Sequence, residues 1–436
     1  MDEAKPRTGA VRDAASRVAA RVAARVAVLT RRPPPGPFRP EFWRSPLRGP
    51  RFTALMGLVL LVGMPLLFVT GLLSYAAYNP DLGGGNDHTP DKGLLGFWLF
   101  PWPTGPSWLY QVNQGVHVIG GFVLVPVVLA KLWSVIPKLF EWPPAKSVLH
   151  ALDRVSLLLL VGSTLFQFAT GVLDTQLAYL FPGSFYRLHF YGAWVFFAAL
   201  VVHVTTRFAK MRRGLHGEGG EDLKARNPAP PTISRRGAVA LVGAGSLTLF
   251  ALTVGQVIGG PLRRTALLAP RGGADPGPGE NGFQVNKPAS LRGITAEETG
   301  ERWRLRILGP GGREASLSRD ELLALPQTRA RLAIDCVEGW STGDQDWSGV
   351  RLAELARLVD AEPDDMFVES LQRSGAFRAV YLRANQVRDP LSLLALNVNG
   401  APLSADHGYP ARVVVPNNPG VHQTKWVARL TLGRPA

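Results

Sequence analysis

Cysteine is almost absent from this sequence, since Cys336 is the only one among 436 residues. One thiol cannot form a disulfide within the chain. It also cannot supply a CxxCH attachment site for c-type haem or the ligands of an iron–sulfur cluster. Any redox chemistry in the chain therefore has to use histidine-bound haem, a flavin, or a metal that accepts a single thiolate.

Acidic residues are also in the minority. The chain has 33 Asp and Glu against 48 Lys and Arg, which gives a formal net charge of +15. The basic residues concentrate at 1–51 and around 207–236, on the flanks of apolar segments, and no basic stripe alternates with aromatic residues. This distribution is typical of the cytoplasmic loops of membrane proteins, and it predicts no nucleic-acid partner.

Apolar runs dominate the first part of the chain. Five segments are long enough, at about 20 residues each, to cross a bilayer. We place them at 53–76, 112–136, 153–180, 187–209 and 237–260. Residues 270–436 have mixed charge and only short apolar stretches. The expected fold is multi-domain: an all-α transmembrane bundle of four helices plus a fifth span, followed by an α+β domain.

Lysine and arginine set the expected orientation. They cluster in the loops after the second and fourth spans, at Lys131, Lys138, Lys146, Lys210, Arg212, Arg213, Arg235 and Arg236. Because such loops stay in the cytoplasm, we expect a multi-pass protein of the cell membrane, in contact with lipid. Its N-terminus is then cytoplasmic and its C-terminal domain extracytoplasmic.

Composition shifts give the expected domain boundaries. These are a basic cytoplasmic tail (1–51), a four-helix membrane domain (52–213), a cytoplasmic linker (214–233), a fifth transmembrane anchor (234–260), a Gly/Pro-rich linker (261–282) and the C-terminal domain (283–436). The tail is either a basic amphipathic helix on the membrane surface or a disordered segment. Arg235 and Arg236 either begin a twin-arginine export signal or only follow the positive-inside rule.

Histidines within the spans are candidate metal ligands, because an ionisable side chain in a membrane is costly. His189 and His203 lie fourteen residues apart in the fourth span. A helix separates them by about 21 Å on faces within roughly 40° of each other. His117 has the depth of His189, and His150 is the candidate partner of His203. The alternatives are that these histidines are packing residues, or that His150 lies at the interface and leaves the inner site incomplete.

This arrangement resembles the di-haem cytochrome b subunits of membrane dehydrogenases and reductases over about 50–215. The resemblance implies b-type haem, one group or two, held by His117 with His189 and by His150 with His203. It also implies quinone or quinol as a partner. The first span lacks the histidine that many of these subunits supply there. Gly120 and Gly192 beside the histidines would either admit a macrocycle or pack helices.

The C-terminal domain places its cysteine at the end of an expected strand, 331–335. A thiolate in that position suits a soft metal, although a buried cysteine can also act as a small hydrophobe. We further expect a strand at 303–308, a helix at 318–325 opened by a serine cap, a helix at 352–359, and strands near 366–371, 377–382, 411–415 and 425–432.

Two motifs carry a second resemblance. Ile334-Asp335-Cys336-Val337-Glu338-Gly339-Trp340-Ser341, and Asp406-His407-Gly408-Tyr409-Pro410-Ala411-Arg412 followed by Lys425-Trp426-Val427, resemble the molybdopterin-binding domain of the sulfite oxidase family over 283–433. The resemblance implies that Cys336 binds molybdenum. It further implies that the pterin cofactor is held by Asn286, Trp340, Ser341, His407, Arg412 and Lys425, and that Tyr409 and Asp389 approach the substrate.

Two departures narrow this resemblance. We expect no C-terminal dimerisation domain of the sulfite oxidase kind, and no arginine-rich stretch directly follows the cysteine. It therefore looks more similar to the molybdenum subunit of periplasmic methionine sulfoxide reductase. The expected function is a membrane-bound molybdenum oxidoreductase that moves an oxygen atom to or from a small substrate, exchanging electrons with quinone through haem or with an additional redox subunit. The alternatives are a haem-free anchor served by a soluble carrier, and a non-enzymatic membrane binding or sensor protein.

Overall fold

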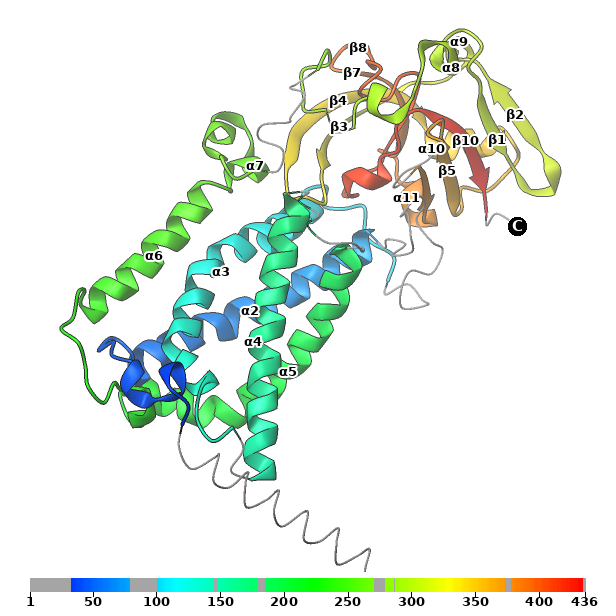
Figure 1. Cartoon of the computed structure of the whole chain (residues 1–436). Helices are drawn as coiled ribbons and strands as arrows, with labels where there is room; N and C mark the ends of the chain where they lie inside the picture. The colour runs from blue at the N-terminus through cyan, green and yellow to red at the C-terminus, as the bar shows by residue number, and fades with distance from the viewer. Residues whose placement is uncertain are drawn as a thin grey trace, which may run out of the picture. The chain divides into compact units, whose positions relative to one another are not determined.

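The computed structural model describes residues 33–78, 100–144, 147–176, 178, 180, 185–269, 279–285, 287–373 and 378–433. Among these residues, five helices are long and apolar enough to cross a membrane. They are α2 (Pro50–Tyr78), α3 (Leu109–Leu139), α4 (Val148–Thr175), α5 (Phe185–Leu215) and α6 (Arg235–Ala251), the last span continuing through the short α7 (Gly255–Ile258) (Figure 1). The five predicted spans are confirmed, but the third ends at Thr175 and not at 180.

The sequence explains where these helices begin and what surrounds them. Pro50 occupies the first position of α2, where its missing N–H costs no hydrogen bond. Ser234 accepts a hydrogen bond from the Gly237 amide at 3.0 Å, at the start of α6. At most a third of the most apolar window of each span is buried, so most of its apolar side chains face outward. Outward apolar faces of this length are what a lipid environment stabilises.

The chain divides into two compact units. The first comprises residues 1–61, 126–165 and 195–243, and the second comprises 62–125, 166–194 and 244–436. In the first unit, Lys131 donates to the Thr53 carbonyl of α2 at 2.7 Å, and Arg207 forms an ion pair with Asp153. The second unit contains one stretch of each of α2 to α5 together with the whole C-terminal domain.

The C-terminal domain contains two five-stranded sheets. One has the order β2-β1-β10-β5-β6, and the other has the order β3-β4-β7-β8 with β9 paired to β7 (Figure 1). The strands are β1 (Leu305–Leu308), β2 (Glu314–Leu317), β3 (Thr328–Asp335), β4 (Ser341–Arg351), β5 (Met366–Ser370), β6 (Ala379–Leu382), β7 (Leu393–Val398), β8 (Ala401–Pro402), β9 (Arg412–Val414) and β10 (Val427–Leu432). The short helices are α8 (Ala296–Thr299), α9 (Arg319–Ala324), α10 (Leu352–Arg357) and α11 (Ala384–Arg388).

Strand β7 joins two hydrophobic cores. Leu394 and Leu396 belong to the core shared with β1, β5, β6 and β10, whereas Leu393 and Ala395 pack on the opposite face with Phe283. Successive strand residues point to opposite faces, so both faces of this sheet are buried. The sheet that contains β3, the strand before Cys336, is therefore packed against a hydrophobic core on each face at β7.

The α+β class is confirmed, and so is the helix at 318–325, where Ser318 forms a capping box with Glu321. Strands β4 and β7 were not predicted. Strand β4 reads Ser-Thr-Gly-Asp-Gln-Asp-Trp-Ser-Gly-Val-Arg, a polar composition typical of loops. It forms a strand because its neighbours β3 and β7 satisfy its backbone on both sides.

Candidate functional site

Cys336 lies in a tight turn between β3 and β4. Its amide donates to the Trp340 carbonyl at 2.8 Å, and the Gly339 amide donates back to the Cys336 carbonyl at 3.0 Å. Gly339 has φ +87°, a conformation that favours glycine. The turn holds the thiol, which is 3% exposed, at the wall of a pocket.

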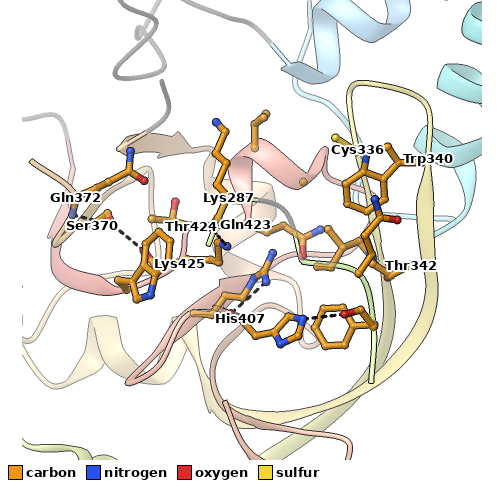
Figure 2. Close-up of a pocket in the computed structure, with 17 residues that line it drawn as sticks. Lys287, Cys336, Trp340, Thr342, Ser370, Gln372, His407, Gln423, Thr424 and Lys425 are labelled. Carbon is orange, nitrogen blue, oxygen red and sulfur yellow. Dashed lines mark hydrogen bonds between the residues drawn. The ribbon is translucent and has the colours of Figure 1, made fainter. Parts of the chain in front are cut away.

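The second wall of this pocket comes from the segment between β9 and β10. Pro419 forms a parallel bridge with Asp335, which brings this segment alongside the cysteine turn. Figure 2 shows Cys336 and Trp340 on one side of the pocket and Ser370 and Gln372 on the opposite side. Between them lie residues from three separate parts of the sequence, Lys287, His407, Gln423, Thr424 and Lys425.

Two basic side chains, the buried Arg412 and the half-buried Lys425, line the same pocket. Arg412 is 6% exposed, and burial lowers its pKa to about 9. Its Nη1 donates to the His407 carbonyl at 3.2 Å, while its Nε has no hydrogen-bond partner among the described residues. Lys425 donates to the carbonyls of Lys287 and Asp406, at 2.8 and 2.7 Å, and burial followed by the charge of Arg412 lowers its pKa well below the usual value. Two neighbouring basic side chains, one buried and one half-buried, favour an anionic ligand, which would stabilise their charged forms.

His407 lines the pocket, but both of its ring nitrogens are used within the protein. Nε2 lies 3.1 Å from the Phe283 carbonyl, which only accepts, and Nδ1 lies 3.0 Å from the Ser404 hydroxyl. Burial, followed by the charge of Arg412, lowers the His407 pKa to about 4. The ring is therefore neutral near pH 7, and it supports the wall of the pocket through Phe283 and Ser404.

The other predicted site residues fall into three groups. Trp340 lines the pocket, and Ser341 stands beside it, its carbonyl accepting from Arg263 at 3.1 Å. Tyr409 packs on the core around Phe283, with the Arg319 guanidinium 5.2 Å from its ring centre. Asp389 ends α11 and accepts from the Leu391 amide at 2.8 Å. Neither Tyr409 nor Asp389 lines the pocket, and Asn286 lies outside the described residues.

Several lining residues were not predicted. Gln423 and Thr424 are nearly fully buried, yet Gln423 Oε1 and Thr424 Oγ1 have no hydrogen-bond partner among the described residues. Buried polar atoms normally have partners, so these atoms mark positions where a bound group would supply them. The sequence signal was the polar run at 417–424 between two apolar strands.

A second candidate site lies among the helices. The rings of His117 on α3 and His189 on α5 have centres 6.2 Å apart and planes at 88°. His117 Nδ1 lies 2.9 Å from the Leu67 carbonyl and 3.2 Å from the Thr70 hydroxyl of α2. His189 Nδ1 lies 3.0 Å from the Thr170 hydroxyl of α4. Four helices therefore contribute to this pair of rings.

The relative levels of His150 on α4 and His203 on α5 follow from a neighbouring ion pair. The ion pair between Arg207 and Asp153 shows which levels of α4 and α5 face each other. His150 precedes Asp153 by three residues and His203 precedes Arg207 by four, on helices that run in opposite directions. At 1.5 Å per residue the two offsets add to about 10 Å. The geometry disfavours the predicted inner pair.

The first turns of α3 contact the C-terminal domain within the second unit. The Asn417 side chain accepts from the Tyr110 amide at 2.6 Å and donates to the Pro103 carbonyl at 2.7 Å. Its carbonyl accepts from the Trp102 indole at 2.8 Å. One turn further along α3, Gln114 donates to the carbonyl of Val337, the residue after the cysteine. The cysteine turn is thus bonded directly to the helix that carries His117.

Comparison with known proteins identifies the domain that contains the pocket. Residues 292–435 match the profile of the family described as "Oxidoreductase molybdopterin binding domain". The C-terminal part contains a molybdopterin-binding domain that is similar to that of sulfite oxidase. In this molybdopterin domain the cysteine turn, the two basic side chains and the polar run surround one pocket.

Three relatives show how far the similarity extends. Mouse mitochondrial sulfite oxidase is 33% identical over 158 residues, which cover 30% of this chain and 29% of the relative. The Gluconobacter oxydans "Protein-methionine-sulfoxide reductase catalytic subunit MsrP" is 32% identical over 148 residues, covering 30% of this chain and 46% of the relative. The Bacillus subtilis "Uncharacterized oxidoreductase YuiH" is 30% identical over 126 residues, covering 29% and 63%. The chain thus spans less than two thirds of each relative.

The residues present in the molybdopterin domain fit its cofactor. A thiolate is a ligand that soft metals accept. The buried Arg412 and the half-buried Lys425 offer charge to a phosphate, and the Gln423 and Thr424 atoms without a partner among the described residues offer further polar contacts. The arrangement can hold an anionic, metal-bearing ligand with its metal at Cys336.

Replacing Arg412 with methionine should weaken cofactor retention by about 10- to 100-fold, because a charge-assisted hydrogen bond is worth roughly 1.5–3 kcal/mol. In the apo protein, losing the Nη1 bond to the His407 carbonyl is offset by removing a buried guanidinium whose Nε has no partner among the described residues, so the change in stability should be small. The measurement is molybdenum and pterin per chain after dialysis. Arg331→Met is the matched control, because Arg331 is exposed and paired with Asp344. Full retention in Arg412→Met would show that this cation does not hold the cofactor.

Proposed function

We propose that this protein is a membrane-bound molybdenum oxidoreductase that transfers an oxygen atom to or from a small substrate and exchanges electrons with quinone through b-type haem. The observation that carries the proposal is the hydrogen-bonded continuity between the cysteine turn and α3, the helix of His117. One compact unit contains the thiol and the His117–His189 pair.

In the molybdenum half, Cys336 would bind the metal while Arg412 and Lys425 bind the phosphate of the pterin. The bound cofactor supplies two-electron oxygen-atom transfer. The chain itself fixes the thiol through the Trp340 and Gly339 hydrogen bonds, and it excludes bulk water because the lining residues are largely buried. The names of the relatives suggest sulfite or a sulfoxide as the class of substrate.

In the haem half, His117 and His189 would hold one haem iron, which would supply one-electron transfer. Two metal–imidazole bonds of about 2 Å, plus roughly 1 Å from each ring nitrogen to its ring centre, put two such ring centres about 6 Å apart. The rings of this pair stand 6.2 Å apart. This half rests on the geometry of the histidines. A single cysteine excludes an intervening iron–sulfur relay in the chain.

The expected orientation fits this scheme. With basic loops in the cytoplasm, the molybdopterin domain lies outside the cell membrane and the N-terminal tail lies inside. Quinone or quinol then meets the haem from the lipid phase. Gln114 bonds to Val337, and Asn417 bonds to α3, so the cysteine turn and the helix of His117 are joined within one chain. The scheme therefore needs no additional redox subunit.

The test is cofactor stoichiometry on the intact protein purified in mild detergent. We expect one molybdenum, one pterin and at least one low-spin haem per chain. Sulfite should reduce the oxidised haem if electrons leave the substrate, and methionine sulfoxide should oxidise the reduced haem if electrons flow the other way. A protein with molybdenum but no haem would support the haem-free anchor with a soluble carrier. A protein with neither would contradict both versions of the enzyme.

A further inference from the structure

A short pattern occurs twice in the helices around the histidine pair. Phe68-Val69-Thr70-Gly71 lies in α2 and Phe168-Ala169-Thr170-Gly171 lies in α4. Each threonine contacts the histidine of the next helix along the chain, Thr70 with His117 and Thr170 with His189. In both helix pairs, α2–α3 and α4–α5, a threonine of the first helix therefore contacts the histidine of the second.

The hydroxyls and a backbone carbonyl together indicate which ring nitrogen carries the proton. Thr70 Oγ1 donates to the carbonyls of Leu66 or Leu67, at 2.8 and 3.1 Å, and Thr170 Oγ1 donates to those of Phe166 or Gln167, at 2.7 and 3.3 Å. Each hydroxyl oxygen can then only accept from the neighbouring Nδ1. The Leu67 carbonyl, 2.9 Å from His117 Nδ1, requires the same assignment because it has no proton to give. Both rings therefore carry hydrogen on Nδ1 and keep a lone pair on Nε2.

The adjacent glycines give the rings their space. A Cβ atom on Gly71 would lie 2.9 Å from His117 Cε1, and one on Gly171 would lie 3.2 Å from His189 Cε1. The first distance is shorter than real Cβ contacts allow, and the second requires the ring to move. Each ring thus lies against the backbone of a glycine through its Cε1 and against a threonine hydroxyl through its Nδ1.

We propose that the two Thr–Gly pairs are positioning elements for the metal ligands, the threonines fixing the tautomer and donor strength of each imidazole and the glycines fixing the angle of each ring. This inference rests on the haem site of the proposed function. A hydrogen bond from Nδ1–H to an acceptor raises the basicity of a ligating imidazole and thereby favours the oxidised metal. Loss of a threonine hydroxyl should therefore raise the midpoint potential of the haem.

The test uses Thr170→Val in the full-length, haem-loaded protein. Thr170 is buried, and valine keeps its shape without the hydroxyl. We expect unchanged haem content, a higher midpoint potential in a redox titration and a shifted low-spin EPR spectrum, with recovery in Thr170→Ser. The matched control is Thr164→Val on the same helix, whose hydroxyl bonds to the Leu160 carbonyl at 2.7 Å and contacts neither His117 nor His189 among the described residues. A potential and EPR spectrum identical to wild type would overturn the role of the threonine.

The glycine is tested in parallel. Gly171→Ala should convert part of the haem from low spin to high spin or release it, because the added methyl displaces the His189 ring. Gly162→Ala in the same helix is the control, since a Cβ there meets nothing within 4 Å. A fully low-spin Gly171→Ala protein would contradict the proposal that this glycine fixes the angle of the His189 ring.

A wild-type protein without haem would count against the proposed function itself, which separates that failure from a failure of this inference. In such a preparation, ¹⁵N NMR spectra of labelled histidine report the tautomer directly. Two rings protonated on Nδ1 would support the role of the threonines, and rings protonated on Nε2 would overturn it.

Discussion

Substituting serine for Cys336 should lower substrate turnover by more than about 100-fold, because loss of even an indirect partner of a metal ligand commonly costs 10- to 100-fold. The substitution replaces one sulfur by one oxygen in a turn that is closed by backbone bonds from Cys336 and Gly339. The fold of the turn should therefore persist. Turnover is measured with an artificial electron donor or acceptor, so that haem plays no part in the result.

The control for this prediction is Ala333→Ser, which introduces the same hydroxyl three residues earlier in β3. Ala333 is half-buried and does not line the pocket. Pterin content and the EPR spectrum of molybdenum should change in Cys336→Ser and stay as in wild type in Ala333→Ser. If Cys336→Ser turned over substrate at the normal rate, the thiol would not be the metal ligand.

Replacing His189 with alanine should remove one complete low-spin haem per chain while molybdenum content stays the same. His117→Ala should give the same deficit, and the double variant should lose no more than either single one, since the two rings, 6.2 Å apart, would serve one iron. Residues that act as a unit show such non-additive losses. The measurement is haem content together with the reduced-minus-oxidised absorption spectrum.

His150→Ala is the matched control for the histidine prediction. The level of the Asp153–Arg207 ion pair separates His150 from His203 along the helix axes, so this variant should keep the haem of the first pair. An additional deficit in His203→Ala would reveal a second haem with another ligand. Unchanged haem content in His189→Ala would contradict the ligand assignment.

The membrane part of the fold was predictable because length and hydropathy decide it. All five spans appear close to the expected positions. The soluble domain was harder, since β4 is polar and its pairing depends on strands about 10 and 50 residues away in the sequence. Local composition cannot report a partner at that distance, and tertiary pairing overrides it.

The candidate site divides in the same way. Cys336, Arg412 and Lys425 were predicted and line one pocket, because two motifs fix their places at strand ends. Tyr409 and Asp389 were predicted to approach the substrate, but neither lines the pocket, because Tyr409 packs on the core around Phe283 and Asp389 ends α11. Residues 405–410 form a turn, so closeness to His407 in the motif does not bring Tyr409 into the same pocket.

The glycines that lie next to the histidine rings were also not predicted from the sequence. Gly120 and Gly192 attracted attention because they lie in the same helices as His117 and His189, yet a Cβ at these positions would meet Leu67 and Gln167. They pack helices. The glycines that touch the rings, Gly71 and Gly171, lie on the preceding helices. The spacing of residues within one helix does not determine which residues of another helix they contact.

Asn417 also has a consequence for how the molecule matures. Its side chain completes the first turn of α3 at Tyr110, from a position 307 residues later in the chain. That turn leaves the ribosome long before Asn417 does, so the Tyr110 amide cannot form this hydrogen bond until the 307 residues that follow it have been synthesised. Completion of an early helix end therefore depends on a segment that is synthesised much later and on the folding of the domain that contains it.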